Sequence, residues 1–82
     1  MADMLDATGL RCPIPVLRAR KRLRAMAPGD RLEVWTDDPA SPIDMRHFCA
    51  VEGHEIVEAQ EGDSPYRFVI ARAAPSIPES TD

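Results

Sequence analysis

The chain has 82 residues, of which 44% are hydrophobic and 29% charged, and its formal net charge is −4 at pH 7. This length suits one small domain with a compact core and no second domain. No hydrophobic run approaches the roughly 20 residues that cross a membrane, and the acidic N-terminus lacks the basic region and apolar core of a signal peptide. We therefore expect a cytoplasmic protein whose cysteines are thiols and form no stable disulfide.

Two elements are predicted in the first third of the chain. A short apolar stretch ended by Thr8-Gly9 predicts a strand over residues 3–7. A helix is predicted from Pro13 to about Ala27, and Pro28-Gly29-Asp30 ends it. Its apolar stripe comprises Val16, Ala19, Leu23 and Met26, with Leu17 beside it.

Cys12 precedes this helix in the run Cys12-Pro13-Ile14-Pro15. Proline suits the first helical position, so Pro13 is predicted to begin the helix and Cys12 to be its N-cap. Pro15 then falls in the first turn, where backbone donors have no partner within the helix. The donors of Ile14 and Val16 are predicted to face the sulfur, at the positive end of the helix dipole.

Arg11 adds a positive charge beside Cys12. Helix N-termini and neighbouring cations lower the pKa of a cysteine from about 8.5. The pattern therefore predicts a reactive Cys12 thiolate. The alternative is a small buried side chain, which is the commoner state of a lone cysteine.

The remaining chain predicts four more elements. Alternating residues predict a half-buried strand over 31–36, followed by the turn 37–40. Ser41-Pro42-Ile43-Asp44 is typical of a capping box that begins a second helix, which reaches about Glu52 and stops at Gly53. Strands over 54–61 and 66–72 follow as an antiparallel hairpin. The tail over 74–82 has no periodicity and is predicted to be disordered.

The predicted order is therefore βαβαββ, in one domain over residues 1–73. Strands one and two pair in parallel through a right-handed crossover. The economical packing is an α+β fold, a two-layer sandwich with a four-stranded mixed sheet and two helices on one face. Cys12 then lies just past the carboxyl end of the first strand, where open α/β sheets usually keep their sites.

Positive charge is concentrated in the first helix. Six basic residues lie within fourteen residues that contain no acid: Arg11, Arg18, Arg20, Lys21, Arg22 and Arg24. This segregation indicates an acidic partner surface or phosphate contacts, and a solvated helix face is the alternative. Arg18, Lys21 and Arg22 are the candidate partner-binding residues, whereas Arg20 falls near the apolar stripe and needs a carboxylate partner or an extended side chain.

The sequence shows no pattern typical of a metal site or of dithiol redox chemistry. His47-x-Cys49 is not a usual zinc spacing, and we expect no metal and no cofactor. No second cysteine lies near Cys12, which excludes a C-x-x-C dithiol mechanism. Cys49 shares the apolar face of the second helix with Met45 and Phe48, and is predicted to be buried and inert.

The segment Leu5-Asp6-Ala7-x-Gly9-Leu10-Arg11-Cys12-Pro13-x-Pro15 resembles the signature of the TusA (SirA-like) sulfur-carrier family. Later matches are Pro28-Gly29-Asp30, Asp37-Asp38-Pro39-Ala40, Phe48-Cys49 and Pro65-Tyr66-Arg67. The resemblance spans about residues 4–72. It implies a two-layer sandwich in which Cys12 accepts a persulfide sulfur from a cysteine desulfurase and passes it to a relay protein. It also implies that Arg20, Asp37 and Asp38 support the cysteine region or partner docking.

In the best-known branch of the family the relay leads to 2-thiouridine in tRNA. For this chain we expect no membrane partner, and direct nucleic-acid binding is not required. Other branches serve sulfur oxidation or the maturation of molybdenum enzymes. A hypothesis from another class is a non-catalytic adaptor or regulator that binds partners through the basic helix. Loss of Cys12 destroys the first function and spares the second.

Overall fold

A computed structural model describes residues 2–73, so the prediction for the tail 74–82 lies outside the described part of the chain. The elements, in chain order, are β1 (Ala2–Asp6), α1 (Ile14–Arg24), β2 (Arg31–Thr36), α2 (Ser41–Glu52), β3 (Glu55–Gln60) and β4 (Tyr66–Ala71). The predicted βαβαββ order is confirmed.

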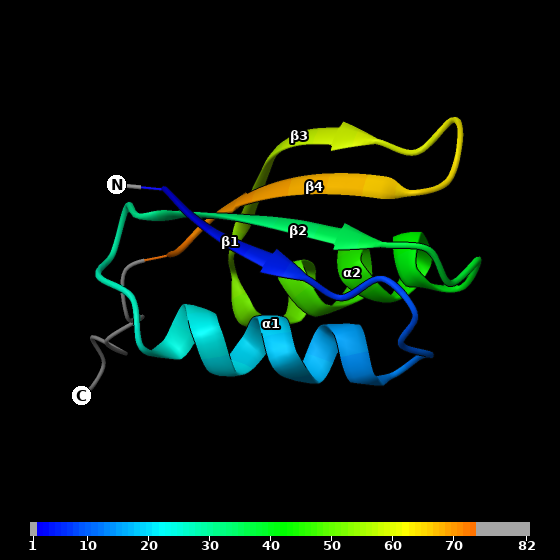
Figure 1. Cartoon of the computed structure of the whole chain (residues 1–82). Coiled ribbons are helices and arrows are strands. Elements are labelled where there is room, and N and C mark those ends of the chain that lie inside the picture. The colour runs from blue at the N-terminus through cyan, green and yellow to red at the C-terminus, as the bar shows by residue number, and fades with distance from the viewer. Residues whose placement is uncertain (1, 74–82) are drawn as a thin grey trace.

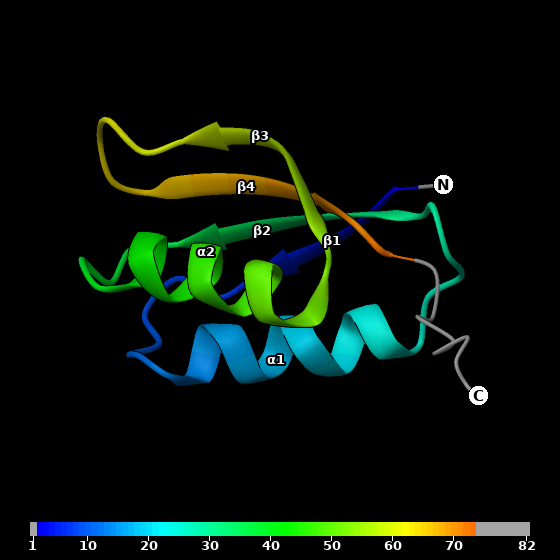
Figure 2. The same cartoon turned by 180° about the vertical axis from the view of Figure 1, so that it is seen from behind.

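The four strands form one mixed sheet in the order β1-β2-β4-β3. β1 runs parallel to β2, whereas β4 is antiparallel to both β2 and β3. Both helices cover the same face, and the other face is open (Figures 1 and 2). The predicted two-layer α+β sandwich is therefore confirmed, and it places β1 and β3 at the two edges of the sheet.

The hydrophobic core lies between the sheet and the two helices. Its fully buried members include Leu23 from α1, Met45 from α2 and Phe68 from β4. Cys49 is buried in the same cluster, as its place on the apolar face of α2 predicted. The predicted stripe of the first helix is confirmed, because its four residues are buried or pack against this cluster, whereas Leu17 beside it is half exposed.

β3 departs from regular alternation at one point. Ile56 opposes Ile70 and Ala59 opposes Phe68, although the first two are three positions apart on β3 and their partners only two positions apart on β4. A register shift between Ile56 and Glu58 accounts for this spacing, because a β-bulge adds one residue to one strand of a pair.

The ends of α2 show one wrong prediction and one correct one. Ala40 is the N-cap, Ser41 is the first helical residue, and no side chain caps the helix, so the expected capping box is absent. The Ser41 N–H donates to the Asp38 backbone carbonyl at 2.9 Å. At the other end Gly53 adopts a φ of +80°, a left-handed conformation that favours glycine after a helix.

Candidate functional site

A short loop carries the chain from β1 to α1. The Ala7 N–H donates to the Trp35 carbonyl at 2.7 Å, which extends the β1–β2 pairing by one residue. The Leu10 N–H then donates to the Ala7 carbonyl at 3.3 Å, and Gly9 within this turn has a φ of +81°. A side chain at position 9 is disfavoured by that φ alone. The turn places Cys12 at the carboxyl ends of β1 and β2, where the sequence predicted it.

Two aspartates after β2 fasten this loop. Asp37 Oδ1 accepts from the Gly9 N–H at 2.9 Å, and Asp38 Oδ2 accepts from the Cys12 N–H at 2.5 Å. Asp38 Oδ1 also accepts from the Ala40 N–H at 2.9 Å. Asp38 therefore joins the backbone of the cysteine loop to the backbone that begins α2.

The thiol itself contacts α2. Cys12 is exposed, and its Sγ donates a hydrogen bond to Oδ2 of Asp44, in the first turn of that helix. An acid in a first turn is favoured by the helix dipole. Asp44, predicted to be the partner of a capping box, is instead the hydrogen-bond partner of the reactive sulfur.

This environment raises the pKa of the Cys12 thiol, contrary to our prediction. The hydrogen bond to Asp44 is the main cause, followed by desolvation and by the negative charges of Asp44 and Asp38. Arg11 acts on a different group, because its charge helps to lower the pKa of Asp38, after the larger effects of the Ala40 and Cys12 N–H groups. In the free protein the site therefore favours a protonated thiol.

The start of α1 explains why the predicted stabilisation of a thiolate is missing. Pro13 is the N-cap, so Cys12 lies one residue outside the predicted cap position. The Cys12–Pro13 peptide bond is cis. The Ile14 N–H, predicted to face the sulfur, donates to the Arg11 carbonyl at 2.8 Å.

The two prolines occupy different environments. Pro13 is exposed, whereas the side chain of Pro15 is fully buried. Pro15 lies in the first turn of α1, where its missing N–H costs no hydrogen bond within the helix. It is therefore a packing residue as well as a neighbour of the site.

Arg20 lies away from the thiol. Its Nη2 pairs at 3.1 Å with Oε2 of Glu52, the last residue of α2. Asp44 is eight residues earlier on the same helix, about 12 Å along its axis. Arg20 has found the carboxylate that its position near the apolar stripe required, and this ion pair joins the two helices.

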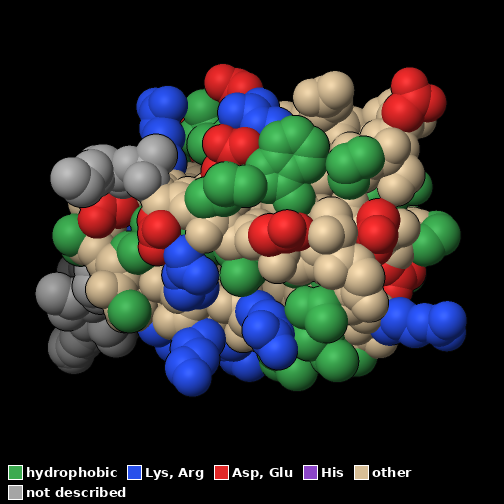
Figure 3. All heavy atoms as spheres, viewed as in Figure 1, with side chains coloured by type: hydrophobic (Ala, Val, Ile, Leu, Met, Phe, Trp, Pro, Cys, Tyr) green, Lys and Arg blue, Asp and Glu red, His purple; other side chains and the backbone are tan. Residues whose placement is uncertain are grey.

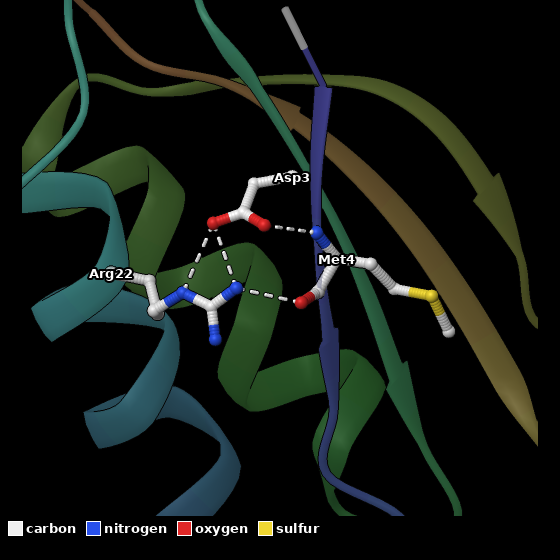
Figure 4. A network of polar contacts seen from close by, with 3 residues as sticks. All are labelled: Asp3, Met4 and Arg22. Atoms are coloured by element: carbon white, nitrogen blue, oxygen red, sulfur yellow. Dashed lines mark hydrogen bonds and ion pairs between the residues drawn. The ribbon is translucent and has the colours of Figure 1, made fainter.

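The basic residues of α1 divide into two groups. Arg18 and Lys21 are exposed, and basic side chains gather over α1 in Figure 3. Arg22 is half buried, and its Nη2 donates at 2.7 Å to both Oδ2 of Asp3 and the carbonyl of Met4 (Figure 4). Arg22 is therefore less free than predicted, because its guanidinium is engaged along the free edge of β1, and its part in partner binding stays a prediction.

Cys49 differs from Cys12 in its exposure to solvent. It is 2% exposed, and burial raises the pKa of its thiol to about 11. Among residues 2–73, no group of three or more His, Cys, Asp or Glu side chains is placed to hold a metal ion. Nor is any helix within this range long and apolar enough to cross a membrane.

A cavity of about 420 Å³ lies beside the cysteine loop. Its lining comes from the loop after β1 and the turn after β2: Gly9, Leu10, Arg11, Asp37, Asp38 and Pro39. The cavity combines one guanidinium with two carboxylates whose oxygens already accept backbone hydrogen bonds. It is therefore a mixed polar hollow beside the cysteine loop and not an apolar ligand pocket.

Asp44 is the site residue that the sequence did not predict. Cys12 and Asp44 are 32 residues apart, and no local pattern links them. The available signal was that an acid in the first turn of α2 follows β2, the parallel neighbour of β1. The segments that follow two neighbouring parallel strands lie at the same end of the sheet.

Fold and site together define a small α+β domain that presents one accessible thiol and buries the other. The chain matches the family model described as sulfurtransferase TusA over residues 3–72. It is also similar to the crystal structure of a SirA-like protein from Desulfitobacterium hafniense, with a TM-score of 0.73 and 30% sequence identity. That match covers 90% of this chain and 100% of the other. The chain belongs to the TusA family of sulfur-carrier sulfurtransferases, as its resemblance predicted.

Proposed function

We propose that Cys12 carries sulfur as a persulfide, taken from a cysteine desulfurase and passed to a downstream relay protein. The observation that carries this proposal is the contrast between the two cysteines. Cys12 is exposed on a loop fastened by Asp37 and Asp38, whereas Cys49 is buried in the core. A partner protein can reach Cys12 without unfolding the domain.

The transfer conserves atoms and electrons. The Cys12 sulfur attacks the terminal sulfur of the donor persulfide, a new S–S bond forms, and the donor S–S bond breaks. The donor leaves as a thiolate and takes up the proton that Cys12 has lost. The products are a Cys12 persulfide and a donor thiol, with no external oxidant or reductant.

Intact-mass measurement tests this function directly. After incubation with a cysteine desulfurase and cysteine, the protein should gain one sulfur atom. The gain should disappear in Cys12→Ser and persist in Cys49→Ala, the matched control. A gain that survives Cys12→Ser would contradict the assignment, and no gain in the wild-type chain would contradict the carrier function.

For the final acceptor we propose the relay that leads to 2-thiouridine in tRNA, on the strength of family membership. The test is the 2-thiouridine content of tRNA in cells that lack their own carrier and express this chain or its Cys12→Ser variant. Restoration by the wild-type chain alone supports the proposal. Failure to restore 2-thiouridine by a chain that does accept sulfur would favour sulfur oxidation or molybdenum-enzyme maturation.

For docking, we propose that the exposed face of α1 meets the partner. Ile14 and Leu17 are 41% and 50% exposed, and with Arg18 and Lys21 they follow the i, i+3, i+4, i+7 spacing of one helix face. This face begins two residues after Cys12, with its apolar end nearer the thiol. A cavity of about 540 Å³ beside it is lined partly by Arg18 and Lys21.

Charge reversal tests this docking face. The double variant Arg18→Glu, Lys21→Glu should slow sulfur acceptance at low salt, because steering by exposed charges acts mainly on the association rate. Its melting temperature should stay near that of the wild type, since neither side chain is buried. Unchanged acceptance at low salt would mean that these residues form only a solvated helix face. An adaptor without transfer chemistry predicts partner binding that depends on these charges and is unaffected by Cys12→Ser.

A further inference from the structure

The Cys12 thiol lies among acidic groups contributed by two separate parts of the chain. Asp44 on α2 accepts the hydrogen bond from Sγ. Asp38, in the turn before α2, holds the Cys12 backbone N–H, and Asp37 holds the neighbouring Gly9 N–H. Arg11, the neighbouring cation in the sequence, acts on Asp38. The thiol therefore faces carboxylates on the side of α2, and the positive charge of its own loop does not offset their negative charge.

This arrangement opposes the chemistry that the site is proposed to perform. The thiolate is the nucleophile in sulfur transfer, and a carboxylate in contact with the sulfur disfavours that anion. The same contact raises the pKa of the Cys12 thiol, with desolvation and Asp38 adding to it. A free carrier of this kind is protected from chance alkylation and oxidation, because both follow thiolate character.

We propose that Asp44 holds Cys12 as a hydrogen-bonded thiol in the free protein, and that a cationic side chain of the docked sulfur donor pairs with Asp44 to release the sulfur for reaction. This inference rests on the proposed carrier function and adds a condition on the partner. The donor must place an Arg or Lys next to its persulfide, opposite the first turn of α2.

This pairing accounts for the proton and for the bond changes in sulfur transfer. When the donor cation engages the carboxylate, Cys12 loses the hydrogen bond that favoured its proton. The freed thiolate attacks the terminal sulfur of the donor persulfide, and the leaving donor thiolate takes the proton. After the donor departs, the Asp44 charge again faces the sulfur.

A small-molecule assay tests the resting state without any partner. The rate of iodoacetamide alkylation of Cys12 is measured against pH in the Cys49→Ala background, for the parent and for Asp44→Asn. We expect the Asp44→Asn profile to move to lower pH, with alkylation at pH 7 roughly threefold faster or more. Glu55→Gln is the matched control, because this exposed acid lies at the opposite end of the sheet.

Two further variants keep the test decisive. Asp44→Glu retains the charge and should alkylate more slowly than Asp44→Asn. If Asp44→Asn fails to fold by circular dichroism, Asp44→Ser provides the same comparison, since serine is tolerated near a helix N-terminus. An alkylation profile that is the same with and without the Asp44 charge would overturn the proposal.

The desulfurase assay tests the role of the partner. If the donor supplies the cation, removal of Asp44 should accelerate alkylation by the small reagent but leave sulfur acceptance unchanged or slower. An equal acceleration of both reactions would show that the partner does not relieve the contact, and would overturn that half of the proposal. The two proposals fail separately, because alkylation needs no sulfur donor: a wild-type chain that accepts no sulfur refutes the carrier function and leaves the Asp44 effect measurable.

Discussion

Replacement of Pro15 by alanine tests how the start of α1 supports the site. The side chain of Pro15 is fully buried, and the change removes two methylene groups. At about 0.8 kcal/mol per buried methylene the lost burial is about 1.6 kcal/mol. The more flexible unfolded chain adds about 0.4–1 kcal/mol. Pro15→Ala should therefore lower the free energy of unfolding by about 2–2.6 kcal/mol, or the melting temperature by roughly 8–20 °C.

Urea unfolding followed by the fluorescence of Trp35 measures this loss. Pro28→Ala is the matched control, because Pro28 is exposed in the loop after α1 and its replacement carries the entropic cost alone. If Pro15→Ala costs no more than Pro28→Ala, burial of this proline contributes nothing and the reasoning fails. Alkylation of Cys12 in the still folded variant then separates packing from any effect on the sulfur.

Three further predictions concern other parts of the fold. Arg22→Ala removes the hydrogen bond to the Met4 carbonyl on the edge of β1. Gel filtration at high protein concentration should therefore show more self-association for this variant than for Arg18→Ala. Equal elution volumes would contradict a role of Arg22 in protecting the strand edge. Burial lowers the pKa of His54, whose Nδ1 accepts a hydrogen bond from the Ala73 N–H, so the unfolded state binds more protons than the folded state. The melting temperature should therefore fall as the pH drops through about 6.5. His54→Gln should lose this pH dependence, and a variant that keeps it would refute the assignment. The buried Thr36 hydroxyl has no hydrogen-bond partner among residues 2–73, so Thr36→Val should leave the free energy of unfolding unchanged or raise it by about 1 kcal/mol. A loss above about 1 kcal/mol would mean that the hydroxyl has a partner.

The fold could be predicted because its signals are local and agree with one another. Proline and glycine mark the boundaries of both helices, and alternation marks β2. Loop lengths then leave few topologies, since a parallel crossover and a hairpin connect the strands. The position of Cys12 past the end of β1 followed from this topology alone. The bulge in β3 did not, because the register shift between Ile56 and Glu58 shows only in their pairing with β4.

The electrostatic state of the thiol could not be predicted in the same way. Arg11 and the start of α1 are neighbours of Cys12 in sequence, and both favour an anion. Asp38 and Asp44 are 26 and 32 residues away, and they contact Cys12 only after β2 has paired with β1. The hydrogen bond between Cys12 and Asp44 raises the pKa of the thiol, and it outweighs the helix dipole because the N-cap of α1 is Pro13 and not Cys12.

One end of the sheet carries both the reactive thiol and the group that restrains it. Parallel pairing of β1 and β2 brings the loop before α1 and the turn before α2 together, and Cys12 there meets Asp44 in the first turn of α2. Basic side chains on α1 and carboxylates around the thiol give the proposed docking region charges of both signs. If both proposals hold, the donor carries acids opposite α1 and a cation opposite Asp44. We then expect a surface that offers only one of the two to bind without reacting.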